Sequence, residues 1–452
     1  MTFKQLKSRR DFLKFGCRTI STLGAAAAFG QAGLVSANAQ TFNDYKALVC
    51  IFLFGGNDSN NLLIPSDTPT YTLYKNVRQN LAIAQGALVP LQGSSFGLHP
   101  SFAPLAPLYT GPGGAVNRLA LVANVGTLVQ PLSRGTYLAP PPQTRVPLNL
   151  FSHSDQTSEW QNAMPQGGAT SGWEGRLADK IFANGTPAFP PAIGVGGSAL
   201  QIVGQTTGSQ PAAITLNGFS LLAPSTDPGT SALQNMLNLS SGVGLVQAAQ
   251  KSLNDAIGVA KAVDAAVNGA SALTTTFPNS DIGTQLAQVA KIIQVRASLG
   301  ATRQIFFCSQ GGYDTHSDQL PQQAQLFGNL AAAMQAFDSA MTQLGTSNNV
   351  TTFTESEFSR TFQPNGNAGT DHAWGGHHLV MGGAVKGGRI YGKFPSLELN
   401  KTDDSGDRGN WIPTVSTDQY GAALANWFGL QAQDSAYVFP NLANFGGPLT
   451  FL

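Results

Sequence analysis

The chain has 452 residues, of which 25 are lysine or arginine and 24 are aspartate or glutamate, and 42% of it is hydrophobic. A chain of this length and apolar content can bury a large core, which excludes a disordered protein. The near-zero formal charge argues against nucleic acid as the main partner. Charged residues make up only 11%, beside 51 glycines and 26 prolines. This composition indicates many loops, where functional sites often lie.

Residues 1–39 have the features of a twin-arginine signal peptide. Arg9 and Arg10 precede an alanine-rich apolar stretch, and 37–39 form a small-residue cleavage site. The alternative is an N-terminal membrane helix, but Arg18 and several glycines and serines interrupt the stretch. We therefore expect a periplasmic protein, exported in folded form by the twin-arginine translocation machinery. After cleavage it would have no membrane span, and 19 basic and 23 acidic residues would remain.

Four apolar runs predict buried strands. They are residues 47–54, 119–125, 304–308 and 350–353. Because these runs lack polar alternation, we expect both faces of the sheet to be covered. Apolar residues at steps of three, four and seven between Leu320 and Leu344 predict a long amphipathic helix after the third run. The pattern predicts a three-layer α/β/α fold with a mostly parallel, doubly wound sheet and a site at the carboxyl ends of its strands.

Residues 40–452 are expected to form this α/β domain. The residue composition and the hydrophobic pattern change within it. Between 167 and 300, short alternating pieces are followed by stretches rich in alanine, glutamine and serine, with few residues of catalytic type. We interpret 167–300 as an inserted cap between two halves of the core.

Two cysteines, Cys50 and Cys308, remain after removal of the signal. Both lie in apolar runs, so we expect buried, unpaired thiols that pack as small hydrophobic groups. A disulfide in the oxidising periplasm is the alternative.

Five of the six histidines lie in polar segments next to carboxylates. These segments are Ser152-His153-Ser154-Asp155, Asp314-Thr315-His316, and Asp371-His372 followed by His377-His378. Imidazole nitrogen and carboxylate oxygen together are ligands for zinc, manganese or iron. Asp58 adds a carboxylate after a buried strand and a Gly-Gly turn, which can also be an ordinary β-turn. The sequence therefore predicts a metal site at the strand ends.

These segments resemble the exported DUF1501 proteins, which are related to the alkaline phosphatase and sulfatase superfamily. The resemblance covers most of the mature chain. It rests on Phe54-Gly-Gly-Asn-Asp58, Phe151-Ser-His-Ser-Asp-Gln156, Gly311-Gly-Tyr-Asp-Thr-His-Ser-Asp-Gln319, Thr354-Glu-Ser-Glu-Phe-Ser-Arg360, and Gly369-Thr-Asp-His-Ala-Trp-Gly-Gly-His-His378 with the glycine-rich run 381–388. The motifs are specific for the family and less specific for an activity.

The resemblance implies one or two divalent metals, zinc or manganese before calcium, that bind the oxygens of a phosphate or sulfate ester. It implies the metal ligands Asp58, Asp314, His316, Asp371 and His372, with His378 as a further candidate. The spacing Asp-x-His departs from the superfamily's Asp-x-x-x-His, which puts joint ligation by Asp314 and His316 in doubt. Ser356-Glu-Phe-Ser359 stands where the superfamily often has Ser-Asp-His-Gly, so Glu357 would take a ligand position and Phe358 would replace a histidine.

The nucleophile has no clear signature, because the cysteine motif of sulfatases is absent. Ser152 beside His153 is the candidate, activated by a metal and assisted by Arg360 as an anion contact. Ser152 can instead belong to a capping loop before a helix, and Arg360 to an ordinary ion pair. His377 and His378 precede an apolar run and can be plain strand residues.

The sequence thus supports two functions. The first is a periplasmic metal-dependent hydrolase of phosphate or sulfate esters, acting on a small-molecule or polymer substrate. The alternative is an exported binding or assembly protein that keeps the fold without turnover. No Gly-x-Gly-x-x-Gly helix start and no Walker loop is present, which argues against dehydrogenases and ATPases.

Overall fold

The computed structural model describes residues 42–111, 117–183, 187, 189–206, 212–214, 235–237 and 243–452. The predicted signal peptide lies outside these residues and stays a prediction. Within the described part of the chain, no helix is long and apolar enough to cross a membrane.

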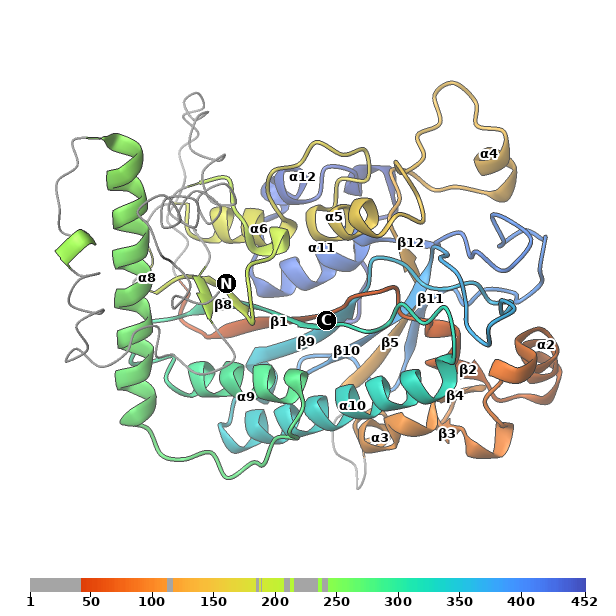
Figure 1. Ribbon diagram of the computed structural model, residues 1–452, viewed down its shortest axis with the longest axis horizontal. Coiled ribbons are helices and arrows are strands. Elements are labelled where there is room, and N and C mark those ends of the chain that lie inside the picture. The colour runs from red at the N-terminus through yellow and green to blue at the C-terminus, as the bar shows by residue number, and fades with distance from the viewer. Residues whose placement is uncertain are drawn as a thin grey trace, which may run out of the picture.

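A nine-stranded sheet forms the centre of the molecule (Figure 1). Its strands are β1 (Lys46–Leu53), β5 (Leu119–Gly126), β6 (Ala192–Val195), β7 (Ala212–Ile214), β8 (Arg303–Gln310), β9 (Val350–Glu355), β10 (Gly376–Met381), β11 (Ile390–Gly392) and β12 (Val415–Ser416). The order is β11-β5-β10-β9-β1-β8-β6-β7, and β12 also pairs with β5. The pairings are parallel except for those of β10, which runs antiparallel to both β5 and β9.

Helices cover both faces of the sheet, as Figure 1 shows. Below it lie α3 (Ala106–Thr110), α9 (Asp281–Gln294) and α10 (Gln319–Gln343), and above it α5 (His153–Asn162), α6 (Trp173–Ile181), α11 (Thr417–Phe428) and α12 (Ser435–Val438). The predicted α/β/α architecture is therefore confirmed. The helices α2 (Thr68–Arg78), α4 (Arg134–Leu138) and α8 (Gly244–Asn268), and a small sheet of β2 (Leu63–Pro65), β3 (Val89–Pro90) and β4 (Phe96–Leu98), lie outside these layers.

Strand β1 shows why the apolar runs form the core. Val49, Ile51 and Leu53 pack into the cluster that contains α9 and α10, whereas Leu48 and Phe52 pack into the cluster that contains α6 and α11. All these side chains are fully buried. A strand covered on both faces needs apolar residues at every position.

The two cysteines are free and buried, as the favoured interpretation predicts. Cys50 on β1 lies in the cluster with α6 and α11, and Cys308 on β8 lies in the cluster with α9 and α10. The two thiols thus lie on opposite faces of the sheet, since Cys50 pairs with Phe307 and Cys308 pairs with Ile51.

Residues 167–300, for which the sequence predicts a cap, contribute β6 and α9 to the central layers. β6 pairs in parallel with β8, and α9 packs into the lower core. Part of the remaining segment lies outside the described residues, so the division into a core domain and a cap stays a prediction.

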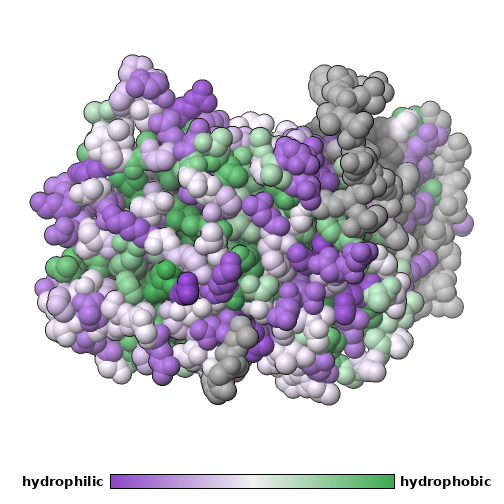
Figure 2. Space-filling view, turned by 180° about the vertical axis from the view of Figure 1, so that it is seen from behind, coloured by the Kyte–Doolittle hydropathy of each residue, from purple (hydrophilic) through white to green (hydrophobic). Residues whose placement is uncertain are grey.

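On the reverse face of the molecule, hydrophilic and hydrophobic residues are intermingled (Figure 2).

Candidate metal centre

Polar loops follow three adjacent parallel strands, β9, β1 and β8. Asp314 comes after β8 and Glu357 after β9, and His153 is the first residue of α5. Because parallel strands in register end at one edge of the sheet, these loops meet there. The chain thus brings residues more than 150 positions apart into one site.

Four side chains form what we call the histidine cluster: His153, Asp314, His316 and His372. Ligand atoms of His153, Asp314 and His372 all lie within 4.8 Å of one another, an arrangement that could hold a metal ion. The Nε2 atoms of His153 and His372 are each 3.5 Å from Asp314 Oδ1. His316 Nε2 is 3.0 Å from Asp314 Oδ1 and 3.0 Å from His372 Nε2. The side chains are between 24% and 48% exposed, so small molecules can reach them.

Each histidine of the cluster is oriented by an oxygen atom at its other ring nitrogen. An Nδ1–H that donates to this oxygen leaves the lone pair on Nε2, which points into the cluster. The pairs are His153 Nδ1 with Glu357 Oε1 at 2.9 Å, His316 Nδ1 with Asp371 Oδ1 at 3.2 Å, and His372 Nδ1 with the Phe151 carbonyl at 2.8 Å.

These lone pairs test whether a cation fits the site. His153 Nε2 is buried and has no hydrogen-bond partner among the described residues. The Nε2 atoms of His316 and His372 lie 3.0 Å apart, so two lone pairs facing each other there repel unless a proton or a cation lies between them. A cation among them removes both problems, so the residues fit a bound metal ion. Ring nitrogens suit zinc or iron better than calcium, which takes six to eight oxygen ligands.

The charge state of Asp314 suits metal binding. Partial burial raises the pKa of its carboxyl, but Arg360, His316 and His153 together hold it below the usual value. Burial lowers the pKa of His372, so this ring is neutral at pH 7. A carboxylate and a neutral imidazole are the forms that coordinate a metal.

Glu357 and Asp371 were expected among the metal ligands, and the structure places them behind the imidazoles. Glu357 is 1% exposed and accepts hydrogen bonds from His153 and, at 2.7 Å, from the Gly55 amide. Partial burial raises the pKa of Asp371, but hydrogen bonds from Arg408, Asn365 and His316 lower it overall. Both carboxylates therefore position a histidine.

Arg408 was not expected from the sequence. Its Nη1 lies 2.5 Å from Asp371 Oδ2, opposite the oxygen that meets His316. No motif marks this arginine, which lies in the Gly-Asp-Arg-Gly turn at 406–409. Only its position against an acidic residue of the candidate site gives it a role.

Arg360 was expected to contact substrate, and it is instead buried beneath the loops. Its guanidinium donates to Asp314 and to four backbone carbonyls. These belong to Gly55, Gly56, Tyr313 and Thr370. Arg360 therefore fixes the loops after β1 and β8 against each other.

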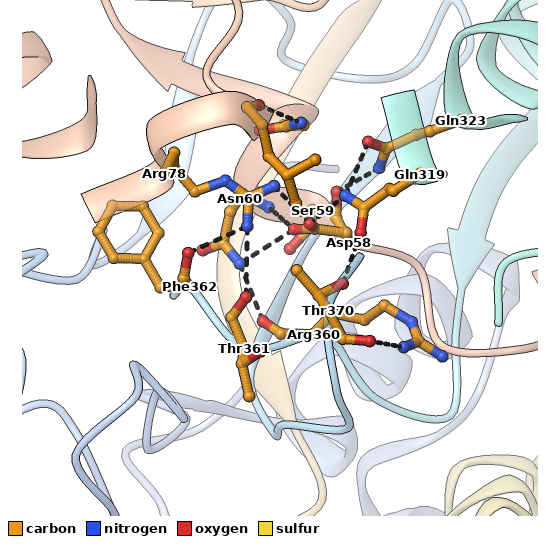
Figure 3. A network of polar contacts seen from close by, with 12 residues as sticks. Asp58, Ser59, Asn60, Arg78, Gln319, Gln323, Arg360, Thr361, Phe362 and Thr370 are labelled. Atoms are coloured by element: carbon orange, nitrogen blue, oxygen red, sulfur yellow. Dashed lines mark hydrogen bonds and ion pairs between the residues drawn. The ribbon is translucent and has the colours of Figure 1, made fainter. Parts of the chain in front are cut away.

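Asp58 lies outside the histidine cluster. It belongs to the network of polar contacts that Figure 3 shows. Its Oδ2 lies 2.5 Å from both Arg78 Nη2 and Gln319 Nε2, and its Oδ1 accepts from the backbone and side chain of Asn60. The Asp58 and Arg78 side chains are both fully buried. With every oxygen engaged by a donor, Asp58 is a partner of Arg78 in this structure and not a metal ligand.

His378 also lies apart from the cluster. It is buried on β10, and its ring is 5.0 Å from that of Trp160 and 5.9 Å from that of Tyr420. Burial lowers its pKa to about 3. In this structure His378 is therefore an ordinary strand residue, which is the alternative interpretation from the sequence, and it lies outside the candidate metal site.

Ser152 occupies the N-cap position of α5. Its hydroxyl is 2.5 Å from Asp155 Oδ2, and it accepts from the Asp155 amide. This is the capping loop given above as the alternative to a nucleophile. Phe358 packs its ring 4.8 Å from that of His153 and 4.7 Å from that of His372, so it supports the rings from the side.

Comparison with known proteins gives one family. Residues 142–410, more than half of the chain, match the family described as protein of unknown function DUF1501. No curated protein matches the sequence.

Several solved structures share part of the fold at 9% identity. The PsFucS1 sulfatase from Pseudoalteromonas sp. matches over 86% of this chain and 70% of its own, with a TM-score of 0.30. Ps i-CgsB matches over 79% and 70%, with a TM-score of 0.33, and the phosphonate monoester hydrolase SpPMH from Silicibacter pomeroyi over 78% and 71%, with 0.28. Similarity at this level does not bear on activity. The family match, over 142–410, includes all four residues of the histidine cluster, and the chain belongs to the DUF1501 family.

Proposed function

We propose that this protein is an exported, metal-dependent hydrolase of phosphate or sulfate esters. One observation carries the proposal: three Nε2 atoms converge on Asp314 Oδ1 in an open site, each with its Nδ1 held by an oxygen. Such a donor set, with zinc as the first candidate metal and manganese as the second, is typical of hydrolytic centres.

The residues divide the work as follows. His153, Asp314 and His372 would hold the metal, and His316 lies beside them as a fourth nitrogen. When bound, a divalent ion supplies Lewis acidity towards an ester oxygen and lowers the pKa of a water towards about 7. Ser152 caps α5 and donates its hydroxyl to Asp155, so it serves the start of the helix, and we assign the role of nucleophile to a water. Arg360 and Glu357 hold the loops and the His153 ring in place.

The experiment compares metal content and ester hydrolysis in the same preparations. Signal-cleaved protein purified without chelators is expected to contain one zinc or manganese ion per chain and to hydrolyse p-nitrophenyl phosphate or sulfate. His153→Ala and His372→Ala should lose both the ion and the turnover, whereas the exposed Ser154→Ala should lose neither. A folded protein that stays metal-free after incubation with zinc and manganese contradicts the proposal.

The second candidate is an exported binding or assembly protein. It is favoured by the Asp58 to Arg78 pair, which leaves one cluster for a metal among the described residues, and by the capping role of Ser152. A protein that binds the ion but gives no turnover with either ester would support this candidate.

A further inference from the structure

Two adjoining cavities open at the carboxyl ends of β6 and β8. Their volumes are about 240 and 330 Å³, and both are lined by Gly196 and Ser309. This size is at the lower end of the range for small-molecule pockets. In α/β sheets, ligands bind outside the carboxyl ends of the strands.

One hydrogen bond connects the lining of the smaller cavity to the loop that carries Asp314. Phe54, which lines it, accepts a hydrogen bond at 3.1 Å from the Tyr313 amide, next to Asp314. Gln161, also in the lining, lies eight residues after His153 on α5, which corresponds to about 12 Å along the helix. A ligand long enough to span about this distance can have its ester group at the histidine cluster and its other end in the cavity.

The lining offers hydrogen-bonding groups without charge. Gln161 is 4% exposed and its Oε1 accepts from the Gln201 amide at 3.3 Å, but its Nε2 donor has no partner among the described residues. The backbone of Ser309 is held on both sides by Gln285 at 2.8 Å, and its hydroxyl makes no hydrogen bond within the described part of the chain. Both groups remain available to a ligand.

The apolar and charged groups of the lining restrict the chemical class of ligand further. The apolar part of the smaller cavity's lining comes from Phe54, Val195, Ala199, Leu200 and Phe307. Across the lining of both cavities, Asp281 is the single charged residue. An anionic ligand finds no counter-charge here, whereas a neutral ligand with hydroxyl groups and C–H faces finds partners for both.

We propose that these cavities bind an uncharged, polyhydroxylated group, a sugar unit, as the alcohol part of the ester. The proposal rests on the proposed function for the position of the ester itself. The sugar would donate to and accept from Ser309 and receive a hydrogen bond from Gln161, while its anionic ester group stays at the histidine cluster.

The test measures sugar binding separately from hydrolysis. Neutral trisaccharides of glucose, galactose and mannose are titrated into metal-free protein, and their binding is followed by saturation-transfer NMR. Trigalacturonate is the charged counterpart. We expect at least one neutral trisaccharide to bind and trigalacturonate not to bind. Ser198→Trp, which places a large ring at the exposed rim of the smaller cavity, should weaken binding at least tenfold. Ser339→Trp, on an exposed face of α10, is the matched control and should bind as the parent does.

Three results separate the outcomes. If His372→Ala still binds a neutral trisaccharide but has lost hydrolysis, the result supports both proposals. Binding without hydrolysis in the parent protein supports the sugar site and contradicts the hydrolase. If no neutral trisaccharide binds, or if Ser198→Trp binds as tightly as the parent protein, the sugar site is overturned. The proposed metal site is unaffected by either result.

Discussion

Glu357 joins the loop after β1 to the first residue of α5. One carboxylate oxygen accepts both the Gly55 amide at 2.7 Å and His153 Nδ1 at 2.9 Å. The carboxylate is 1% exposed, so its geometry is set by these donors and not by water. The orientation of His153 therefore depends on a residue that does not touch the metal position.

Replacement of Glu357 should weaken metal binding without abolishing it. Glu357→Gln keeps an oxygen acceptor but removes the negative charge behind the His153 ring, and substitutions of this type cost about 10–100-fold in metal affinity. Zinc affinity measured by competition with a chelating dye checks the expectation. Glu398→Gln, at an exposed position, is the control. An unchanged zinc affinity in Glu357→Gln would show that His153 needs no support from this carboxylate.

The architecture could be predicted from the sequence because the apolar runs leave few choices. The run at 47–54 has no polar face, so it can only be a strand covered on both sides, and β1 spans Lys46–Leu53. Residue type also located the site, since His153, His316 and His372 each lie within two residues of an aspartate. The edge of the sheet then follows from parallel topology.

The roles of individual carboxylates could not be predicted in the same way. Asp58, Asp314, Glu357 and Asp371 all follow buried strands or lie beside histidines, yet only the Asp314 carboxylate belongs to the histidine cluster. The difference lies in the partner that meets each oxygen. For Asp58 the partner is Arg78, which lies on α2 and has no apolar neighbourhood in the sequence that would mark it as buried.

Loss of Arg78 should destabilise the protein strongly. Arg78→Met leaves the buried Asp58 carboxylate without its counter-charge, which costs about 3–5 kcal/mol of the free energy of unfolding. Urea unfolding at pH 7 measures the loss. The double variant Asp58→Asn, Arg78→Met removes both charges and should recover part of it. A double variant less stable than Arg78→Met would contradict the idea that the unpaired charge is the cause.

Export should depend on the two arginines of the predicted signal peptide. Replacement of Arg9 and Arg10 by lysine retains positive charge but removes the pair that the twin-arginine machinery reads. We expect the uncleaved precursor to accumulate in the cytoplasm, as detected by cell fractionation and N-terminal sequencing. Lys4→Arg, outside the pair, should be exported normally. Normal periplasmic delivery of the double lysine variant would point to a different export route.

The pH dependence of stability should reveal a buried acid next to the site. Glu355 on β9 is 2% exposed, and burial raises its pKa to about 8, partly offset by hydrogen bonds from Gln201, Cys50 and Trp173. A carboxyl whose pKa is higher in the folded than in the unfolded state stabilises the fold while it is protonated. Its contribution is complete below pH 4.5 and is lost as the pH rises towards 8.

Glu355→Gln should therefore flatten the pH profile, because its amide cannot ionise. Urea midpoints at pH 5, 7 and 9 would show the variant gaining on the parent protein as the pH rises, by roughly 1.4 kcal/mol for each pKa unit of the shift. The buried Glu174 has a pKa raised in the same direction, so the variant should keep some pH dependence. Glu398→Gln, at an exposed position, should follow the parent at each pH. A constant difference between Glu355→Gln and the parent from pH 5 to 9 would mean that Glu355 is already ionised in the fold.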